Sequence, residues 1–141
     1  CHVYLGAAAV ADYTPARIRE HKIKKNNNGL TLELKRTTDI IKKLGEMKTR
    51  QFIVGFSVET ESVIAHSVQK MQTKNMDMIV VNNPLEKGAG FATDTNRVTM
   101  IERDGGREDL PMLSKLEVAD RILEKVARMI SVKDGNNRKT L

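Results

Sequence analysis

The sequence has few aromatic residues and only one cysteine. Among its 141 residues there is no tryptophan, and aromatic residues make up 4% of the chain. Proteins that bind single-stranded nucleic acid usually stack the bases on aromatic side chains, so this composition argues against a nucleic-acid partner. The one cysteine, Cys1, leaves no pair for an internal disulfide and too few thiols for a cysteine zinc site.

Long apolar runs and common catalytic signatures are absent as well. No segment approaches the roughly 18 apolar residues that cross a bilayer, and the chain does not open on a signal-peptide pattern. These absences favour a cytoplasmic protein with no membrane partner. The motifs GxxxxGK[ST], GxGxxG, CxxC, HExxH and GxSxG are all missing, so hydrolase and metalloprotease functions have no support.

Positive charge is concentrated near the N-terminus. The net charge is +6, and the stretch 17–25 alone carries five cations and one anion. Such a cluster attracts nucleic acid, anionic lipid or a small polyphosphate. A solvated basic loop with no ligand is the alternative.

Apolar runs alternate with helical patterns along the chain. Buried strands are predicted at 3–10, 52–56 and 76–81, a half-exposed strand at 30–35 and a further strand at 96–102. One helix is predicted to begin near Ile40 after a Thr cap, and two more are predicted at 60–75 and 113–130. Turns are predicted at 26–29 and 104–106, and a Gly-rich loop within 84–96. The last helix is expected to turn one face inward, made of Leu116, Ala119, Ile122, Leu123, Val126 and Met129. This order predicts an α/β domain with a mostly parallel sheet flanked by helices.

Ligands of parallel sheets bind at the carboxyl ends of the strands. Three polar segments follow such ends: the loop at Ala11 and Asp12, the segment 56–59, and Asn82 with Asn83. We expect them to converge on one cleft. An acid at position 12 can bind a ribose hydroxyl, a base amino group or a metal, or it can cap the next turn.

Cations and a helix start add to this candidate cleft. Lys22 and Lys24 alternate in a predicted loop that could close over phosphates. His66, Lys70 and Lys74 share one face of a predicted helix, where two lysines could hold an anion between them or stand in solvent. The free N–H groups near residues 39–41 could bind an oxygen-bearing ligand, as at any helix start.

The order of these segments resembles the phosphopantothenate–cysteine ligase family. The resemblance rests on Ala8-Ala9-Val10-Ala11-Asp12-Tyr13, Pro15, Lys22-Ile23-Lys24-Lys25, Asp39-Ile40, Gly55-Phe56-Ser57-Val58-Glu59-Thr60, Lys70, Lys74, Asp77-Met78-Ile79-Val80-Val81-Asn82, Gly90-Phe91, Asp94 and Asn96. It covers residues 1–130, leaving 131–141 as a polar tail expected to be flexible.

The resemblance implies a Rossmann-like fold, a homodimer and a ligase of coenzyme A synthesis. In that family CTP activates 4′-phosphopantothenate as an acyl-cytidylate, and the amino group of cysteine then forms the amide. Magnesium accompanies the nucleotide, and FMN belongs only to a decarboxylase half fused upstream. Lys22 is the implied catalytic residue. The implied nucleotide contacts are Gly6, Ala7, Ala8, Asp12, Lys22, Thr38, Asp39, Ile40, Ile41, Phe56, Lys70 and Lys74.

The sequence departs from the family pattern in three places. Thr38 stands where a proline is frequent, and Ser57-Val58 precede Glu59-Thr60 where an alanine is frequent. The family's first strand, its Gly-rich loop and a phosphopantothenate-binding asparagine are not in this sequence, so we expect either a piece of the ligase domain or a domain completed by a separate chain. A non-catalytic nucleotide-binding module of the same α/β class is the second hypothesis, and a basic nucleic-acid-binding domain is the third.

Overall fold

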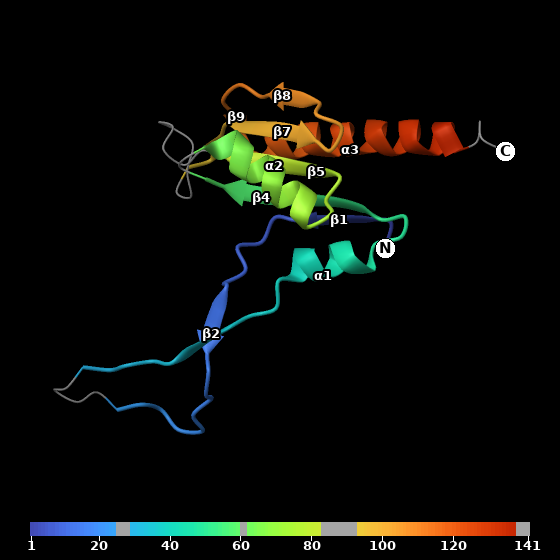
Figure 1. Cartoon of the computed structure of the whole chain (residues 1–141). Helices are drawn as coiled ribbons and strands as arrows, with labels where there is room; N and C mark the ends of the chain where they lie inside the picture. Colours follow the sequence, from blue (N-terminus) through green and yellow to red (C-terminus); the bar gives the residue numbers. More distant parts are fainter. Residues whose placement is uncertain (25–28, 60–61, 83–92, 138–141) are drawn as a thin grey trace.

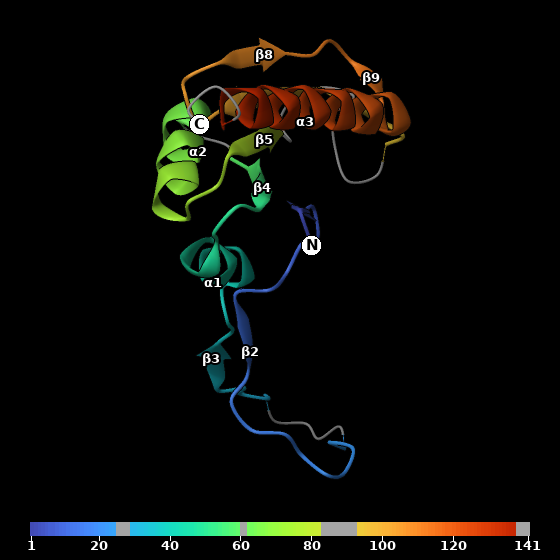
Figure 2. The same ribbon diagram turned by 90° about the vertical axis from the view of Figure 1, so that its right-hand side faces the viewer.

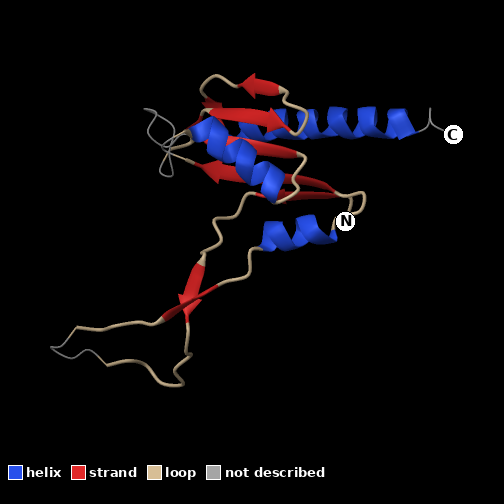
Figure 3. Cartoon of the chain, viewed as in Figure 1, coloured by secondary structure: helices blue, strands red, loops and turns tan. Residues whose placement is uncertain are grey.

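The chain folds around one five-stranded sheet (Figures 1 and 3). The computed structural model describes residues 1–24, 29–59, 62–82 and 93–137. The sheet order is β1-β4-β5-β7-β8, in which β1, β4 and β5 run parallel and β7 and β8 are antiparallel additions at one edge. The strands are β1 (Val3–Gly6), β4 (Phe52–Val58), β5 (Met78–Asn82), β7 (Val98–Glu102) and β8 (Arg107–Asp109).

Helices cover both faces of this sheet (Figure 2). They are α1 (Ile40–Met47), α2 (Val63–Thr73) and α3 (Lys115–Asn137). On one face Met71 of α2 and Ile41 and Leu44 of α1 pack with Ile53 and Ile79. On the other face the buried side chains of α3 are Val118, Ile122 and Val126. The continuous apolar runs of β4 and β5 are explained by this cover, because each strand is buried on both sides.

Two short strand pairs lie outside the main sheet. Strands β6 (Thr95–Asn96) and β9 (Leu113–Ser114) pair just before α3. Strands β2 (Tyr13–Pro15) and β3 (Leu34–Arg36) form an antiparallel ribbon. This ribbon is the base of a long segment that projects away from the sheet, described over residues 13–24 and 29–36 (Figure 1). We call these residues the arm.

The α/β prediction is confirmed, and several element bounds are corrected. The first strand ends at Gly6 rather than at residue 10, and the strand expected at 30–35 covers only Leu34–Arg36. Residues 13–15, for which no strand was predicted, form β2. The turn predicted at 26–29 and the Gly-rich loop at 84–96 fall mostly outside the described residues.

The last helix differs from its prediction in length and in orientation. It reaches Asn137, so the first part of the expected tail is helical. Leu116, Ala119 and Leu123 were expected to face inward but are exposed. Of the predicted inward face, Ile122 and Val126 are buried, and they form one row of the helix with Val118.

Candidate functional site

A hollow of about 300 Å³ lies at the carboxyl ends of β1 and β4. Gly6 closes β1 at its edge, Phe56 and Val58 come from the end of β4, and the start of α1 and the last turn of α2 complete the wall. This is the side of a parallel sheet where ligands bind. An adjacent hollow at the base of the arm shares Asp12 and Asp39 with it.

The hollow gathers most of the residues predicted to bind nucleotide. Those that line it are Gly6, Ala8, Asp12, Thr38, Asp39, Ile40, Ile41, Phe56, Lys70 and Lys74. Ala7 does not line the hollow, although the residues on either side of it, Gly6 and Ala8, do. His66 is exposed and also stands outside it. The Asp12 loop and the end of β4 therefore meet at one place, as the strand-end argument predicted. The prediction is wrong for the third segment, because Asn82 does not line the hollow, and Asn83 lies outside the described residues.

Lys22 is not brought to the hollow. It lies in the arm, where it lines a separate surface depression with its neighbours from Arg19 to Lys24. The arm points away from the sheet, so the basic cluster of the same chain stands apart from the other candidate residues (Figure 1).

Small residues let the walls of the hollow approach one another. A Cβ atom on Gly6 would lie 2.8 Å from Cδ1 of Ile41 and 3.0 Å from Cε1 of Tyr4. Glycine at the end of β1 therefore allows the first turn of α1 to pack close to the strand.

The segment before α1 is bound to the loop that carries Asp12. The Thr37 hydroxyl donates to the Ala11 carbonyl at 2.6 Å, and the Thr37 N–H donates to the Asp12 carbonyl at 2.9 Å. These bonds hold Asp12 and Asp39 on the same wall. The predicted Thr cap of α1 is wrong because the Thr37 hydroxyl is used here, and Asp39 caps the helix instead.

Asp39 and Lys74 form an ion pair across the hollow. The Lys74 Nζ lies 2.7 Å from Asp39 Oδ2, while Asp39 Oδ1 accepts from the Lys42 N–H at 3.0 Å. Partial burial raises the pKa of Asp39, but the hydrogen bonds and positive charges of Lys74 and Lys42 outweigh it, so its pKa lies below the usual value. Both ends of the pair are available to a ligand, because both residues line the hollow.

The hollow combines groups that suit a phosphorylated ligand. Lys70 and Lys74 supply cations from α2. The N–H groups of Ile40 and Ile41 open α1, where they have no carbonyl of their own helix to bind. Phe56 lines the hollow and also packs against the core beside α3, so it serves the core while presenting an apolar surface.

Several lining residues were not predicted. They are Tyr4, Ala9, Val10 and Thr37. Val10 belongs to the apolar run that was interpreted as strand, and the early end of β1 at Gly6 turns it toward the hollow. No signal in the sequence marks where an apolar run leaves its sheet.

The described residues contain no group of three or more His, Cys, Asp or Glu side chains that could hold a metal ion. Mg²⁺ usually binds through one or two carboxylates together with waters and substrate phosphates. Asp12 and Asp39 are the carboxylates that line the hollow, so the donor set is compatible with a magnesium ion that arrives with a nucleotide. Among the described helices, none has the length and apolar character needed to span a membrane.

Comparisons with known proteins agree on one family. The profile of the DNA/pantothenate metabolism flavoprotein C-terminal domain matches residues 1–130. The chain is 46% identical over 127 residues to the coenzyme A biosynthesis bifunctional protein CoaBC of Bacillus subtilis, covering 90% of this chain and 31% of that protein. It therefore spans about a third of that relative's length.

Solved structures give the same result. The C-terminal domain of a coenzyme A biosynthesis bifunctional protein CoaBC superposes with a TM-score of 0.72 at 38% identity, covering 92% of this chain and 55% of that one. The Cab2 variant H337A in complex with phosphopantothenate-cysteine has a TM-score of 0.54 at 22% identity, covering 87% of this chain and 44% of that one, which shows a shared fold.

Proposed function

This chain belongs to the DNA/pantothenate metabolism flavoprotein C-terminal domain family, and from that premise we propose that it forms the nucleotide-binding part of a phosphopantothenate–cysteine ligase. One observation carries the proposal. The family-matched segments that were expected to bind nucleotide converge on the hollow at the ends of β1 and β4. A single hollow that combines cations, a helix start and small residues suits a nucleoside triphosphate.

The proposed reaction has two steps. The carboxylate of 4′-phosphopantothenate attacks the α-phosphate of CTP, which forms an acyl-cytidylate and releases pyrophosphate. The amino group of cysteine then attacks the acyl carbon, which forms the amide of 4′-phosphopantothenoylcysteine and releases CMP and a proton.

The residues of the hollow have distinct proposed roles. The ammonium groups of Lys70 and Lys74 hold phosphate oxygens, and the first N–H groups of α1 donate to the same ligand. Phe56 packs against the nucleotide, and Asp12 binds a ribose hydroxyl or faces the metal. Magnesium would neutralise phosphate charge beside Asp12 and Asp39.

We propose that two copies of the chain form a homodimer and that the arm contributes to the contact between them. Leu30, Leu32 and Leu34 alternate along one side of the arm and are more than half exposed, and Ile18 is 97% exposed. Alternating apolar side chains on an extended segment are typical of strands that bury one face. A second copy of the chain would cover them and could receive Lys22 at its own hollow.

Pyrophosphate release tests the proposed function. The intact protein, given CTP, magnesium and 4′-phosphopantothenate without cysteine, should release pyrophosphate in a burst of about one equivalent per site. Omitting 4′-phosphopantothenate should abolish the burst. A burst that does not depend on 4′-phosphopantothenate would contradict the ligase assignment.

The position of Lys22 outside the hollow favours one alternative. A module that binds nucleotide without catalysis needs the hollow but not the arm cations. Such a module would bind CTP in calorimetry and show no pyrophosphate burst under the same conditions.

A further inference from the structure

The C-terminal halves of α1 and α2 meet at an unusually close backbone contact. A Cβ atom on Gly45 of α1 would lie 2.0 Å from the Lys74 carbonyl oxygen and 3.2 Å from Cβ of Asn75. Real Cβ atoms do not approach a carbonyl oxygen so closely, so any other residue at position 45 would push the two helices apart. Gly45 is itself buried.

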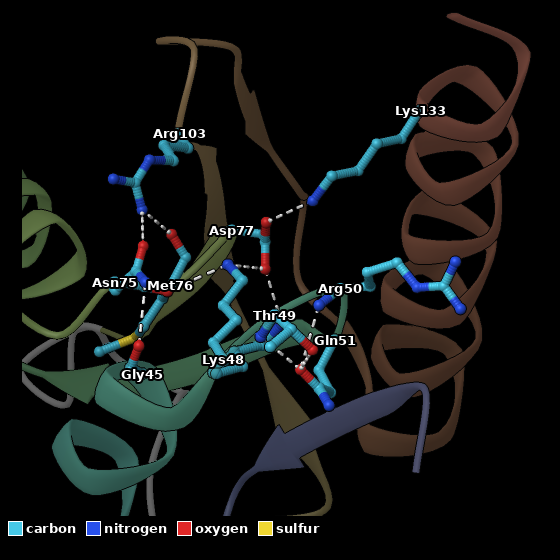
Figure 4. Close-up of polar contacts among 11 residues, drawn as sticks. Gly45, Lys48, Thr49, Arg50, Gln51, Asn75, Met76, Asp77, Arg103 and Lys133 are labelled. Carbon is cyan, nitrogen blue, oxygen red and sulfur yellow. Dashed lines mark hydrogen bonds and ion pairs between the residues drawn. The ribbon is translucent and has the colours of Figure 1, made fainter. Parts of the chain in front are cut away.

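Asn75 fastens this contact (Figure 4). Its side-chain amide donates to the Gly45 carbonyl at 2.9 Å, and its Oδ1 accepts from Arg103 Nη1 at 2.6 Å. Lys48, just after α1, donates from Nζ to the Asn75 carbonyl at 3.1 Å. Asn75 has a positive φ of 54°, a conformation that asparagine tolerates better than most residues.

The contact is anchored to the sheet and to α3. Lys48 Nζ lies 2.6 Å from Asp77 Oδ2, which also accepts from the Ile53 N–H at 2.8 Å. Lys133 of α3 reaches the other oxygen of Asp77 at 3.3 Å. Asp77 is only 7% exposed, so the end of α1 is held against a buried point of the sheet.

Lys74 connects this contact to the hollow. Its backbone carbonyl faces Gly45, while its ammonium reaches Asp39, the cap at the other end of α1. The two contact points on α1 are six residues apart, or about 9 Å along a helix. The lysine side chain therefore runs back along α1, and the place of its ammonium depends on where its backbone is held.

We propose that Gly45 and Asn75 are positioning residues for Lys74. They fix the backbone of Lys74 against α1, so that its ammonium lies at the start of this helix, where the proposed function places the phosphates of the nucleotide. The inference rests on that proposed function, and it adds two residues that touch no ligand themselves.

Two substitutions in the intact protein test the proposal. Gly45→Ala should weaken CTP binding by up to roughly tenfold, the loss expected when the Lys74 ammonium no longer reaches a charged ligand. Asn75→Gly removes the side-chain hydrogen bond to Gly45, and glycine can adopt the same positive φ. This second variant tests the proposal if the Gly45→Ala protein does not fold. Thr73→Ala is the control, because the Thr73 hydroxyl bonds only within α2, to the Gln69 carbonyl.

A double-mutant cycle separates positioning from general loosening. In a Lys74→Gln background Asn75→Gly should no longer change CTP affinity, while in a Lys70→Gln background it should still weaken CTP binding. Equal effects of Asn75→Gly in both backgrounds would overturn the positioning role. If Lys74→Gln alone left CTP affinity unchanged, the proposed nucleotide site itself would be wrong.

Discussion

At the scale of single residues, several polar side chains that line the hollow already form hydrogen bonds or ion pairs within the protein. Asp39 caps α1 and pairs with Lys74, and Thr37 bonds back to the Ala11 loop. A ligand phosphate would therefore compete with a carboxylate for the Lys74 ammonium. The exchange replaces one anion by another, so the lysine stays extended toward the start of α1 both with and without nucleotide.

The Asp39–Lys74 pair predicts a pH dependence of stability. The pKa of Asp39 is lowered in the folded protein, so its contribution is present above the ordinary carboxyl range and is lost as the pH falls through the lowered value. The Asp39→Asn variant keeps a capping oxygen but has no carboxyl to titrate. Between pH 5 and pH 3, roughly the range in which carboxyls titrate, we expect its Tm to fall less than the Tm of the unaltered protein. Parallel pH dependences for both proteins in thermal melts would refute this.

Lys70 and Lys74 should act on the same ligand. Each Lys→Gln change is expected to weaken CTP binding by roughly tenfold, the scale of a hydrogen bond to a charged group, and the double change should be less than additive. Calorimetric titration measures this. Lys43→Gln, an exposed lysine on α1 away from the hollow, is the matched control. Wild-type affinity in the double variant would leave both lysines as solvated surface residues.

Lys22 is the predicted catalytic cation. Activation of a carboxylate by CTP concentrates negative charge on the α-phosphate and the departing pyrophosphate. An ammonium delivered there would stabilise the transition state more than the ground state. Lys22→Gln should therefore slow single-turnover pyrophosphate release by roughly 100-fold, with a much smaller change in CTP affinity. Release at the wild-type rate would show that Lys22 takes no part in the chemistry.

At the scale of elements, one buried carboxylate joins four of them. Asp77 precedes β5, accepts from the Ile53 N–H of β4, and pairs with Lys48 after α1 and Lys133 on α3. The side chains of Asp77 and Lys48 are 10% and 9% exposed, so their pairing is largely shielded from solvent. Removing one partner of such a pair leaves the other charge without compensation.

Asp77→Ala should lower the free energy of unfolding by about 3 kcal/mol or more. Urea denaturation of the intact protein measures this. Glu46→Ala, an exposed acid on α1, should change it by less than about 0.5 kcal/mol. A cost for Asp77→Ala as small as that of the control would mean that solvent readily replaces its partners.

Elements with strong local patterns were predictable, and their contacts with one another were not. The runs in β4 and β5 and the turn before β8 carry clear periodicity and turn residues, and they appear where expected. The orientation of α3 depends on how wide a sheet face it covers, which no local pattern records. The ion pair of Asp39 with Lys74 likewise depends on the distance between two helices separated by 15 residues of other structure.

At the scale of the whole molecule, the candidate site is divided between two parts. The hollow belongs to the sheet and its helices, while the basic cluster belongs to the projecting arm (Figure 2). Sequence order placed Asp12 and Lys22 ten residues apart, which led us to expect both at one site. The extended arm separates them, because ten extended residues can span roughly 33 Å.

Complementation between two inactive variants tests the proposed homodimer. A Lys22→Gln chain has an intact hollow, and a Lys74→Gln, Lys70→Gln chain has an intact arm. If each arm serves the hollow of the other copy, one of the two sites in a mixed dimer is whole. The mixture should then regain roughly a quarter to a half of the pyrophosphate-release activity of the unaltered dimer, depending on how many dimers are mixed. No recovery after mixing and reassembly would show that arm and hollow act within one chain.

The arm also bears on how the chain folds. It lies between β1 and β4, which pair directly in the sheet although 45 residues separate Gly6 from Phe52 in the sequence. The Ala16 N–H donates to the Glu33 carbonyl at 2.8 Å, so the two sides of the arm meet at its base and close a loop of their own. Doubling the length of such a loop costs only about 0.6 kcal/mol of closure entropy. Insertions or deletions between these two sides would therefore have little effect on the stability of the sheet, which leaves the length of the arm open to change during evolution.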